Sequence, residues 1–407
     1  MSDFLKEFKD RGYFYQCTDE KELGKKLDQE SIKGYIGFDC TAKSLHVGSL
    51  LQIMCLRLLQ KHGHRPIVLL GGGTTRIGDP SGKDKTRKIL DENEIEKNIK
   101  SIEMILKKFL YTENKKTSPL FVNNYSWLKN LNYISFLRDI GKHFTINKML
   151  SFDSVKLRLE REQSLSYMEF NYMILQAYDF LELNKKENCI LQIGGSDQWG
   201  NIVNGVELVK RYSSNEVFGL TTELITLASG AKMGKTESGA IWLDKELFSA
   251  FDYWQFWRNT DDRDVLKFLK MFTDLNLSEI AKISNQDINQ QKVILANEAT
   301  SMLHGAEQAK ESEYIAKNSF SEGSSGENLP DIKIDESNID SDIIKLISII
   351  EKSLSKSEIR RLIKSNGIKI NNETISDEKF IISKELIEKN NFIKLSIGKK
   401  KHYKIVF

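Results

Sequence analysis

The first half of the chain alternates short apolar runs with turns that contain glycine. Residues 33–39, KGYIGFD, predict a strand that ends in a turn. Ser44 can cap a helix that continues through residues 50–62, and Gly63 would end that helix. The following run, RPIVLLGGG, predicts a second strand, so these segments form a βαβ unit and indicate a parallel sheet.

The same pattern returns in residues 187–201, ENCILQIGGSDQWGN, as an apolar strand, a Gly-Gly turn and a helix start. Ligands of parallel sheets bind at the carboxyl ends of strands, so we expect these turns to meet at one site. Residues 164–184 predict one helix, and residues 246–316 predict several helices whose core includes Trp254 and Trp257.

The end of the chain predicts a separate compact module. Residues 316–331, AKNSFSEGSSGENLPD, are rich in Ser and Gly and are typical of a linker. After them, SDIIKLISIIEKS and SKSEIRRLIKSNG predict two helices, and IKINNETI and NFIKLSIGKKKHYKIVF predict short strands. A chain of 407 residues is too long for one ordinary core, which agrees with two or three domains.

Charge separates this module from the rest of the chain. Residues 340–407 hold 15 basic and 9 acidic residues, whereas the preceding part holds 45 and 48. A basic module on a mildly acidic body indicates nucleic-acid binding, although a solvated charged surface would have the same composition.

Cysteine and histidine spacing argues against a metal site and a disulfide frame. The cysteines are scattered without a CxxC pair, and the histidines lack metal spacing. The N-terminus, MSDFLKEFKD, has no apolar core of signal-peptide length, and no apolar run reaches the ~20 residues that span a bilayer. We therefore expect a protein of the cytoplasm or another reducing interior, without a membrane segment.

Two separate segments suggest phosphate chemistry. In SLHVGS, His46 and Gly48 stand where a loop becomes a helix, and a helix start favours phosphate. In ASGAKMGKTESGA, Lys232 and Lys235 flank a glycine and can neutralise a leaving group. Taken alone, each segment has an ordinary alternative, namely a structural histidine and an exposed basic turn.

Two further segments offer polar groups. GGGTTRIGDPSGKDKTRK fails the P-loop spacing, but it still carries Asp79 and two basic residues. In FNYMILQAYDF, Tyr172, Gln176 and Asp179 share one helix face, which is costly in a core unless a polar ligand is bound. A solvent-facing stripe explains that spacing equally well.

Taken together, HVGS and KMGKT resemble the paired HIGH and KMSKS signatures of class I aminoacyl-tRNA synthetases. The segments YIGFDCTAKSLHVGS, NNYSWL, FLRDIGKHFTINKML and LQIGGSDQWGNI closely resemble the bacterial-type tyrosyl-tRNA synthetases, across nearly the whole chain. The tail segment SKSEIRRLIKSNGIKINNETI is similar to an RNA-binding module shared with a ribosomal protein.

The resemblance implies an α/β fold and a division of the chain. It predicts a Rossmann-like catalytic domain (1–245), an α-helical anticodon-binding domain (246–320), a linker (321–339) and a small α+β RNA-binding module (340–407). It also implies tyrosine, ATP with accompanying Mg²⁺, and tRNA(Tyr) as substrates, and no tightly bound cofactor. The partner is a second copy of the chain, with residues 136–144, FLRDIGKHF, near the interface.

Residue roles follow from the same motifs. The residues implied in catalysis at the phosphates are Thr41, His46, Lys83, Arg87, Lys232, Lys235 and Thr236. The residues implied in tyrosine binding are Tyr35, Asp79, Tyr172, Gln176, Asp179 and Gln198. The residues implied in ATP binding are Gly37, Asp39, His46, Gly48, Ser49, Gly195, Asp197, Lys232, Met233 and Lys235.

Two positions depart from the family pattern. Ser49 stands where His or Asn is usual, and Cys40 replaces a common proline just before Thr41. Three other functions share part of this pattern: a metabolite nucleotidyltransferase, a tryptophanyl relative, and an RNA-binding protein without catalysis. The second lysine loop and the basic tail argue against the metabolite nucleotidyltransferase. Tyr35 and Asp179 argue against the tryptophanyl relative, and the intact His46 argues against an RNA-binding protein without catalysis.

Overall fold

The computed structural model describes residues 2–81, 90–230, 233–236, 239–319, 329, 331–335, 338–351, 354–388, 392–398 and 401–407. The chain divides into two compact units, and each is treated by itself. The first unit comprises Met1–Gly234, Ile241–Phe248 and Asn259–Leu295, and the second comprises Lys235–Ala240, Ser249–Arg258 and Ala296–Phe407. This division assigns parts of the range 246–320, which the sequence suggests as one helical domain, to both units.

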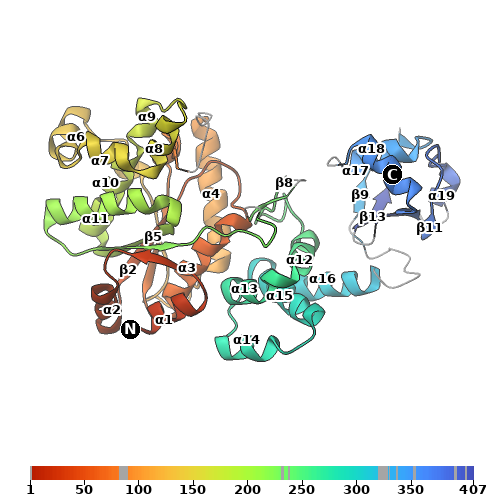
Figure 1. Ribbon diagram of the computed structural model, residues 1–407, viewed down its shortest axis with the longest axis horizontal. Helices are drawn as coiled ribbons and strands as arrows, with labels where there is room; N and C mark the ends of the chain where they lie inside the picture. Colours follow the sequence, from red (N-terminus) through yellow and green to blue (C-terminus); the bar gives the residue numbers. More distant parts are fainter. Residues whose placement is uncertain are drawn as a thin grey trace. The chain divides into compact units, whose positions relative to one another are not determined.

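The first unit is built on a six-stranded sheet (Figure 1). In spatial order its strands are β1 (Phe14–Cys17), β6 (Phe218–Thr222), β5 (Cys189–Gly195), β2 (Lys33–Phe38), β3 (Arg65–Leu70) and β4 (Leu120–Asn123). Only β1 runs antiparallel to its neighbour among these strands, so the predicted parallel sheet is confirmed.

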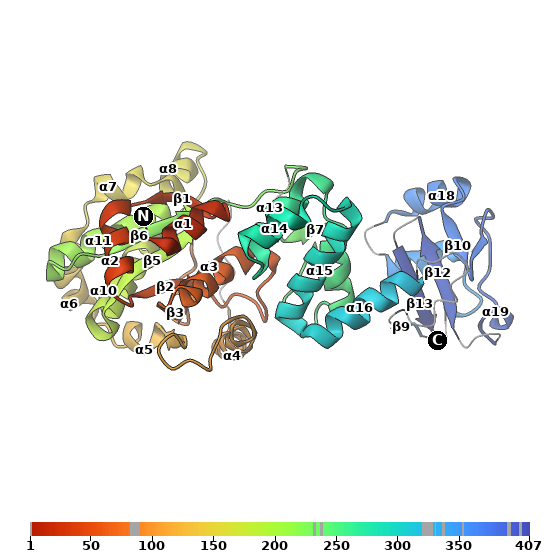
Figure 2. The same ribbon diagram turned by 90° about the horizontal axis from the view of Figure 1, so that it is seen from below.

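Helices cover both faces of this sheet. The helices of the first unit are α1 (Asp3–Asp10), α2 (Glu20–Gln29), α3 (Leu50–Lys61), α4 (Glu92–Phe109), α5 (Tyr125–Leu128), α6 (Tyr133–Asp139), α7 (Ile146–Ser151), α8 (Asp153–Glu160), α9 (Tyr167–Phe170), α10 (Tyr172–Glu187), α11 (Trp199–Ser213), α13 (Asp262–Phe272), α14 (Leu277–Ile283) and the first part of α15 (Ile288–His304). Figures 1 and 2 show α3 on one face and α10 with α11 on the other.

The alternation of side chains along β2 explains this arrangement. Successive strand residues point to opposite faces. Tyr35 therefore packs with Phe180 of α10 in one core cluster, with ring centroids 5.3 Å apart. Gly34 faces α3, where an added Cβ would lie 3.0 Å from the Leu59 side chain. Glycine thus allows α3 to approach the sheet closely.

The strand order reverses beside β2, and this creates the site. β2 pairs with β3 on one side and with β5 on the other, all three running parallel. Tyr35 is the register partner of Ile67 on β3 and of Gln192 on β5. The connections from β2 and β5 leave in opposite directions, so a crevice opens at the strands' carboxyl ends.

The helix after β2 starts later than the sequence predicts. Ser44 does not cap it, because its hydroxyl donates to the carbonyl of Leu45 instead. His46 caps a 3₁₀ turn, Val47–Ser49, by accepting from the Gly48 amide, and α3 follows from Leu50. The sequence prediction of a helix stop is confirmed, since α3 ends at Lys61 just before a glycine with positive φ.

The helix predicted over residues 164–184 is also divided. Ser166 and Glu169 form a capping box that starts α9, and a break at Asn171 separates α9 from α10. Glu169 is buried and pairs with Arg158 of α8 at 3.2 Å. A buried ion pair at this point fixes the entry to α10, the helix that carries most of the predicted tyrosine-binding face.

The second unit contains several helices, a pair of short strands and the C-terminal elements. Its helices and strands are β7 (Lys235–Thr236), β8 (Gly239–Ala240), α12 (Ala250–Arg258), the second part of α15, α16 (Ala306–Ser319), β9 (Asp331–Lys333), α17 (Ile343–Ile350), α18 (Lys356–Lys364), β10 (Ile368–Ile370), β11 (Glu373–Thr374), α19 (Lys384–Glu388), β12 (Ile393–Ile397) and β13 (Lys401–Val406). Trp254 and Trp257 of α12 are buried, as predicted.

The C-terminal elements form a mixed sheet in the order β11-β10-β12-β13-β9 with an isoleucine-rich core. The two helices and the strands predicted for the tail are confirmed. β9 lies inside the range 321–339 suggested as linker, yet it pairs in parallel with β13. The sheet therefore begins within that range. Within the described part of the chain, no helix is both long and apolar enough to cross a bilayer.

Candidate active site

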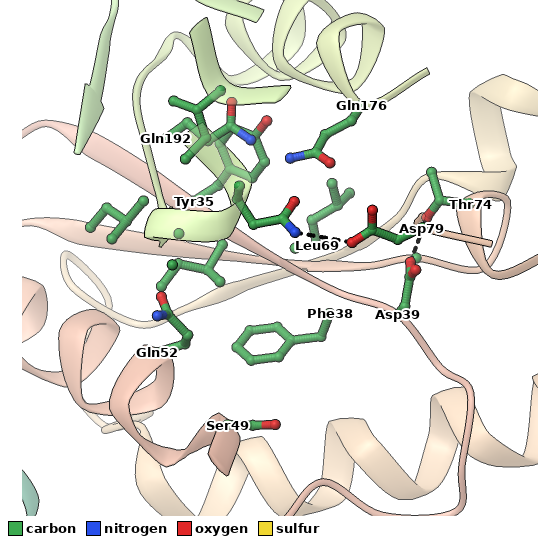
Figure 3. A pocket seen from close by; sticks show the side chains of 18 of the residues that line it. Tyr35, Phe38, Asp39, Ser49, Gln52, Leu69, Thr74, Asp79, Gln176 and Gln192 are labelled. Atoms are coloured by element: carbon green, nitrogen blue, oxygen red, sulfur yellow. Dashed lines mark hydrogen bonds between the residues drawn. The ribbon is translucent and has the colours of Figure 1, made fainter. Parts of the chain in front are cut away.

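A cavity of about 330 Å³ lies at the carboxyl ends of β2 and β5 (Figure 3). Most of the residues implied in tyrosine and ATP binding line it. They are Tyr35, Gly37, Asp39, Gly48, Ser49, Asp79, Tyr172, Gln176, Asp179, Gly195, Asp197 and Gln198. The face of α10 that carries Tyr172, Gln176 and Asp179 therefore points into the cavity, so the alternative of a solvent-facing stripe is wrong.

Asp179 is the buried carboxylate of this cavity. It is 1 % exposed, and its two oxygens accept hydrogen bonds from Asn124 Nδ2 at 2.9 Å and Trp127 Nε1 at 2.8 Å. Burial raises the pKa of Asp179 to about 7, although the two donors act in the opposite direction. Asp179 is thus a carboxylate that titrates near neutral pH.

Tyr35 places a second polar group at the same end of the cavity. Its hydroxyl is fully buried and finds no hydrogen-bond partner among the described residues. Burial and the nearby charge of Asp179 raise the pKa of this phenol well above its ordinary value. Gln192 Oε1 is likewise buried and without a partner in the described part of the chain. A buried polar atom without a partner is costly, so this end of the cavity suits a polar ligand.

A second network surrounds Asp39 at the end of β2. Thr74 Oγ1 donates to Asp39 Oδ1 at 2.9 Å, and the Tyr172 hydroxyl donates to Asp39 Oδ2 at 3.1 Å. Asn124 Nδ2 also donates to Thr74 Oγ1 at 3.1 Å, and this bond connects Asp39 with Asp179. Figure 3 shows Thr74 and Asp39 side by side. Two carboxylates are thereby held in fixed positions along one wall.

Asp79 closes the cavity from the loop after β3. Its Oδ2 accepts from Gln198 Nε2 at 3.0 Å, and its Oδ1 accepts from the Ser81 amide at 2.9 Å. Asn201 in turn donates to Gln198 Oε1 at 3.1 Å. The carboxylate and the amide therefore orient each other, and both can contact a ligand that carries an ammonium group.

The HVGS signature, which ends at Ser49, lies at the opposite end of the cavity from Tyr35 (Figure 3). His46 Nδ1 accepts from the Gly48 amide at 3.0 Å. A neutral imidazole that accepts at Nδ1 carries its proton on Nε2, so that atom is the donor. His46 is both a cap and a potential donor.

Main-chain atoms of Met233 and Gly234, which belong to the KMGKT signature, lie close to His46 and Gly48. An added Cβ on Gly48 would lie 2.6 Å from His46 Cε1 and 2.9 Å from the Met233 carbonyl oxygen. Gly234 has φ +104°, and a Cβ there would lie 2.8 Å from the Gly48 nitrogen. Glycine is required at both positions, and the two signatures meet through backbone.

The remaining predicted residues stand apart from the cavity lining. Thr41 is exposed on the loop after β2, and His46 and Met233 lie next to lining residues. Lys83, Arg87 and Lys232 fall outside the described residues. Lys235 and Thr236 form β7. The roles of all these residues stay predictions.

Sequence reasoning missed the donors Thr74, Asn124 and Trp127, which hold Asp39 and Asp179. It also missed Gln52 and Gln192, which line the cavity. The motif NNYSWL belongs to the resemblance, yet nothing in its pattern connects it to Asp179, more than 50 residues after Asn124. A polar Gln192 inside an otherwise apolar strand was the one local signal.

The described residues include no group of three or more His, Cys, Asp and Glu side chains arranged to hold a metal ion. Carboxylates do line the cavity, but Asp39, Asp79 and Asp179 are each held by separate donors.

Comparison with known proteins identifies the class. The family model of "tRNA synthetases class I (W and Y)" matches residues 27–321. A tyrosine–tRNA ligase of Pelagibacter ubique is 72% identical over 407 residues, covering 100% of this chain and 99% of the relative. One from Zymomonas mobilis is 54% identical over 404 residues, covering 98% of this chain and 97% of the relative.

A solved structure agrees with these relatives. The C-terminally truncated mitochondrial tyrosyl-tRNA synthetase of Aspergillus nidulans superposes with a TM-score of 0.70 at 33% identity, covering 77% of this chain and 93% of that one. The chain belongs to the class I tRNA synthetases and, within them, to the bacterial-type tyrosine–tRNA ligase family. The fold and family expected from the sequence are thus confirmed.

Proposed function

We propose that this enzyme activates L-tyrosine with ATP, releasing pyrophosphate, and transfers the tyrosyl group to the terminal adenosine of tRNA(Tyr). The observation that carries the proposal is the pair at the end of the cavity, Tyr35 and Asp179. The substrate phenol would donate to Asp179 and accept from the unpaired Tyr35 hydroxyl. A phenylalanine ring would leave both groups unsatisfied, and an unsatisfied buried polar group costs ~1–3 kcal/mol.

The activation step needs no nucleophile from the protein, because the substrate carboxylate attacks the α-phosphate of ATP directly. Catalysis then consists of positioning and of stabilising charge on the phosphates. His46 is suited to this task, since its Nε2 proton can be donated to a phosphoryl oxygen at a helix start. Thr41 would assist it.

The ammonium group of tyrosine would lie between Asp79, Tyr172 and Gln176. Asp79 would supply the negative charge, Gln198 holds the Asp79 carboxylate in place, and Gln198 would lie near the substrate carboxylate. Hydrogen bonds to a charged group are about twice as strong as neutral ones, which suits the recognition of an amino acid at this end.

The nucleotide would bind along the carboxyl ends of the strands. The residues proposed to contact it are Gly37, Asp39, Gly48, Ser49, Gly195, Asp197 and Met233, with Lys83, Arg87, Lys232, Lys235 and Thr236 at the pyrophosphate. Magnesium would arrive as part of the substrate MgATP, since Mg²⁺ prefers phosphate oxygens and water to a protein cage.

Residues 246–320 are proposed to bind the anticodon arm, and the basic residues of 340–407 to bind the long variable arm of the tRNA. We assign the enzyme to the cytoplasm. All four cysteines are free thiols, which is typical of a reducing compartment.

The working enzyme is proposed to be a homodimer that contacts its copy through α6 and the residues that follow it. Tyr133 is 57 % exposed, Ile134 70 % and Tyr167 66 %, and they adjoin an apolar cavity of about 470 Å³ that Phe136 lines. Exposed apolar surface of this kind is typical of an interface. Sedimentation equilibrium at micromolar concentration should give twice the chain mass, and a monomer alone would contradict the proposal.

ATP–pyrophosphate exchange with each of the twenty amino acids tests the proposed activity. Tyrosine should support exchange, and phenylalanine and tryptophan should support very little. Exchange with tryptophan instead, or with none of the twenty, would overturn the assignment. A His46→Ala variant with unchanged exchange would overturn the proposed catalytic site alone.

A further inference from the structure

The loop that leads to the second signature is a short hairpin. The Met233 amide donates to the Ile225 carbonyl at 3.2 Å, so the residues on both sides of the hairpin face each other. Near the tip, the Gly230 amide donates to the Leu227 carbonyl at 2.8 Å, with Gly230 at φ +81°. This hairpin, defined here by the described residues 225–230 and 233, follows β6 in the chain.

One carboxylate holds the tip of this hairpin. Asp264 Oδ2 accepts from the Ala228 amide at 2.7 Å, and Asp264 is only 6 % exposed. A second and longer contact joins Lys267 Nζ to the Thr226 carbonyl at 3.4 Å. Hydrogen bonds from a backbone N–H to an ionised carboxylate are short and strong, so Asp264 is the main tether.

Capping of α13 does not explain why an aspartate stands at position 264. Asp261 already serves as the N-cap of α13, since its side chain accepts from the Arg263 amide at 3.0 Å. Asp264 stands one turn further on and uses its carboxylate outside the helix, on the hairpin. A buried carboxylate is costly to desolvate, so a residue needed only for helix stability would not require one here.

The far end of α13 is fixed to the catalytic body. Arg11, which is 3 % exposed, donates to the carbonyls of Lys270, Thr273 and Leu275 at 2.8, 3.1 and 2.8 Å. The Tyr13 hydroxyl donates to the Met271 carbonyl at 2.8 Å. Arg57 of α3 also pairs with Asp274, its Nε lying 2.7 Å from Oδ1. The helix therefore gives Asp264 a rigid frame from which to position the hairpin.

The other end of the hairpin rests on the first signature. Met233 is buried, and its carbonyl oxygen lies against Gly48. The Ile241 amide donates to the Gly234 carbonyl at 3.2 Å, and the Val47 amide donates to the Ile241 carbonyl at 2.9 Å. A displacement of the hairpin is thus transmitted directly to the turn that His46 caps.

We propose that Asp264 is a positioning residue for tyrosine activation. It touches no substrate and acts through Ala228, fixing where Met233 and Gly234 lie against His46 and Gly48. The inference rests on the proposed phosphate role of His46 and goes beyond it by assigning the group that keeps the two signatures in register. Displacements of about 1 Å in such a site slow reactions by ~100-fold.

The test compares Asp264→Ala and Asp264→Asn with Asp19→Asn. Asp19 is a matched control, because its carboxylate also accepts a hydrogen bond from a backbone amide at a helix start, at 3.0 Å, but Asp19 is exposed and lies far from the hairpin in sequence. Single-turnover formation of tyrosyl-adenylate is measured at saturating tyrosine and ATP, and tyrosine Kd is measured without ATP.

Asp264→Ala should slow adenylate formation by about 10- to 100-fold, with tyrosine Kd unchanged within twofold. Asp264→Asn keeps one oxygen acceptor and should be intermediate, and Asp19→Asn should match the unmodified enzyme. If Asp264→Ala does not fold, Asp264→Asn alone still decides. Unchanged rates in both variants, or a loss of rate matched by an equal loss of tyrosine affinity, would overturn the proposal.

A double variant separates this inference from the proposed function. If Asp264 acts through His46, the losses of Asp264→Ala and His46→Ala should not multiply, and the double variant should be little slower than His46→Ala. Losses that multiply would mean that Asp264 acts elsewhere. A normal rate in His46→Ala would instead refute the proposed role of His46, whatever Asp264 does.

Discussion

At the scale of single residues, the surroundings of a side chain decide its chemistry. Asp39 and Asp179 are both carboxylates on one cavity wall, but Asp39 is half-buried, whereas Asp179 is fully buried and burial raises the pKa of Asp179 to about 7. Its neighbours Asn124 and Trp127 donate to both oxygens and favour the ionised form. We expect the balance between burial and these two donors to set how well Asp179 accepts a hydrogen bond from a substrate phenol.

Tyrosine binding should therefore depend on pH. The ionised form of Asp179 is the stronger acceptor, so tyrosine affinity should rise as the pH increases through about 7. Trp127→Phe removes a donor that lowers the pKa of Asp179, so the midpoint should move to higher pH. Equilibrium dialysis of tyrosine between pH 6 and 8 measures both effects. Asp179→Asn, which cannot titrate, is the control and should give weak binding without this midpoint.

At the scale of elements, the chain uses local contacts to fix how helices meet. The Glu7 carboxylate of α1 accepts from Arg11 at 2.8 Å and Lys61 at 2.7 Å, and contacts His62 Nε2 at 2.8 Å. Burial alone would raise the pKa of Glu7, but these hydrogen bonds outweigh it and lower the pKa to about 2. Glu7 thus ties α1 to the end of α3.

Glu7→Gln should lower the free energy of unfolding at pH 7 by about 2 kcal/mol. Because the folded pKa lies below the ordinary value of 4.5, this stabilisation is present above pH 4.5 and is lost as the pH falls through about 2. Denaturant titrations from pH 7 to pH 2 should show the two proteins converging. The exposed pair of Glu22 with Lys25 is the control, and Glu22→Gln should leave the free energy of unfolding unchanged, because exposed ion pairs contribute little.

The start of α3 allows a second test at this scale. Gly48→Ala would force a Cβ to within 2.9 Å of the Met233 carbonyl, so backbone must move beside His46. We expect adenylate formation to fall at least 10-fold, with tyrosine affinity kept, because Tyr35 and Asp179 lie at the other end of the cavity. Gly24→Ala is the matched control, since its Cβ would meet Leu5 at 3.6 Å and the Ser2 nitrogen at 3.9 Å, both ordinary van der Waals distances, and the substitution should leave the rate unchanged.

At the scale of the whole molecule, we expect tyrosine activation and tRNA binding to use different parts of the chain. Every residue that lines the cavity belongs to the first compact unit. The five-stranded sheet of the tail belongs to the second, as do the exposed basic residues Arg360 and Lys364 of α18. The two steps of the reaction should therefore respond differently to changes in the tail.

Removal of residues 320–407 should leave ATP–pyrophosphate exchange within twofold of the full chain and weaken tRNA charging at least 10-fold. The remaining charging should also depend less steeply on salt concentration, because fewer phosphate contacts are made. A full-length Arg360→Ala, Lys364→Ala variant is the matched control for tail charge alone, and it should lie between the two. Equal charging by the truncated and full chains would exclude the tail from tRNA binding.

The sequence by itself determined the local elements and the family. Apolar runs followed by glycine turns predicted the parallel sheet, because strand and helix periods are properties of neighbouring residues. Long ordered motifs such as LQIGGSDQWGN identified the relatives. The start of α3 was misplaced, since either Ser44 or His46 satisfies the local rules for a cap and only the fold selects between them.

Only the tertiary structure decided which polar groups meet. Asn124 and Trp127 reach Asp179 because β4 lies at one edge of the sheet and α10 packs across its face, a consequence of strand order that no local pattern encodes. In the same way, Asp264 meets Ala228 only because α13 is clamped at its far end. Contacts between distant segments depend on the whole core, and these contacts turned a set of motif residues into one site.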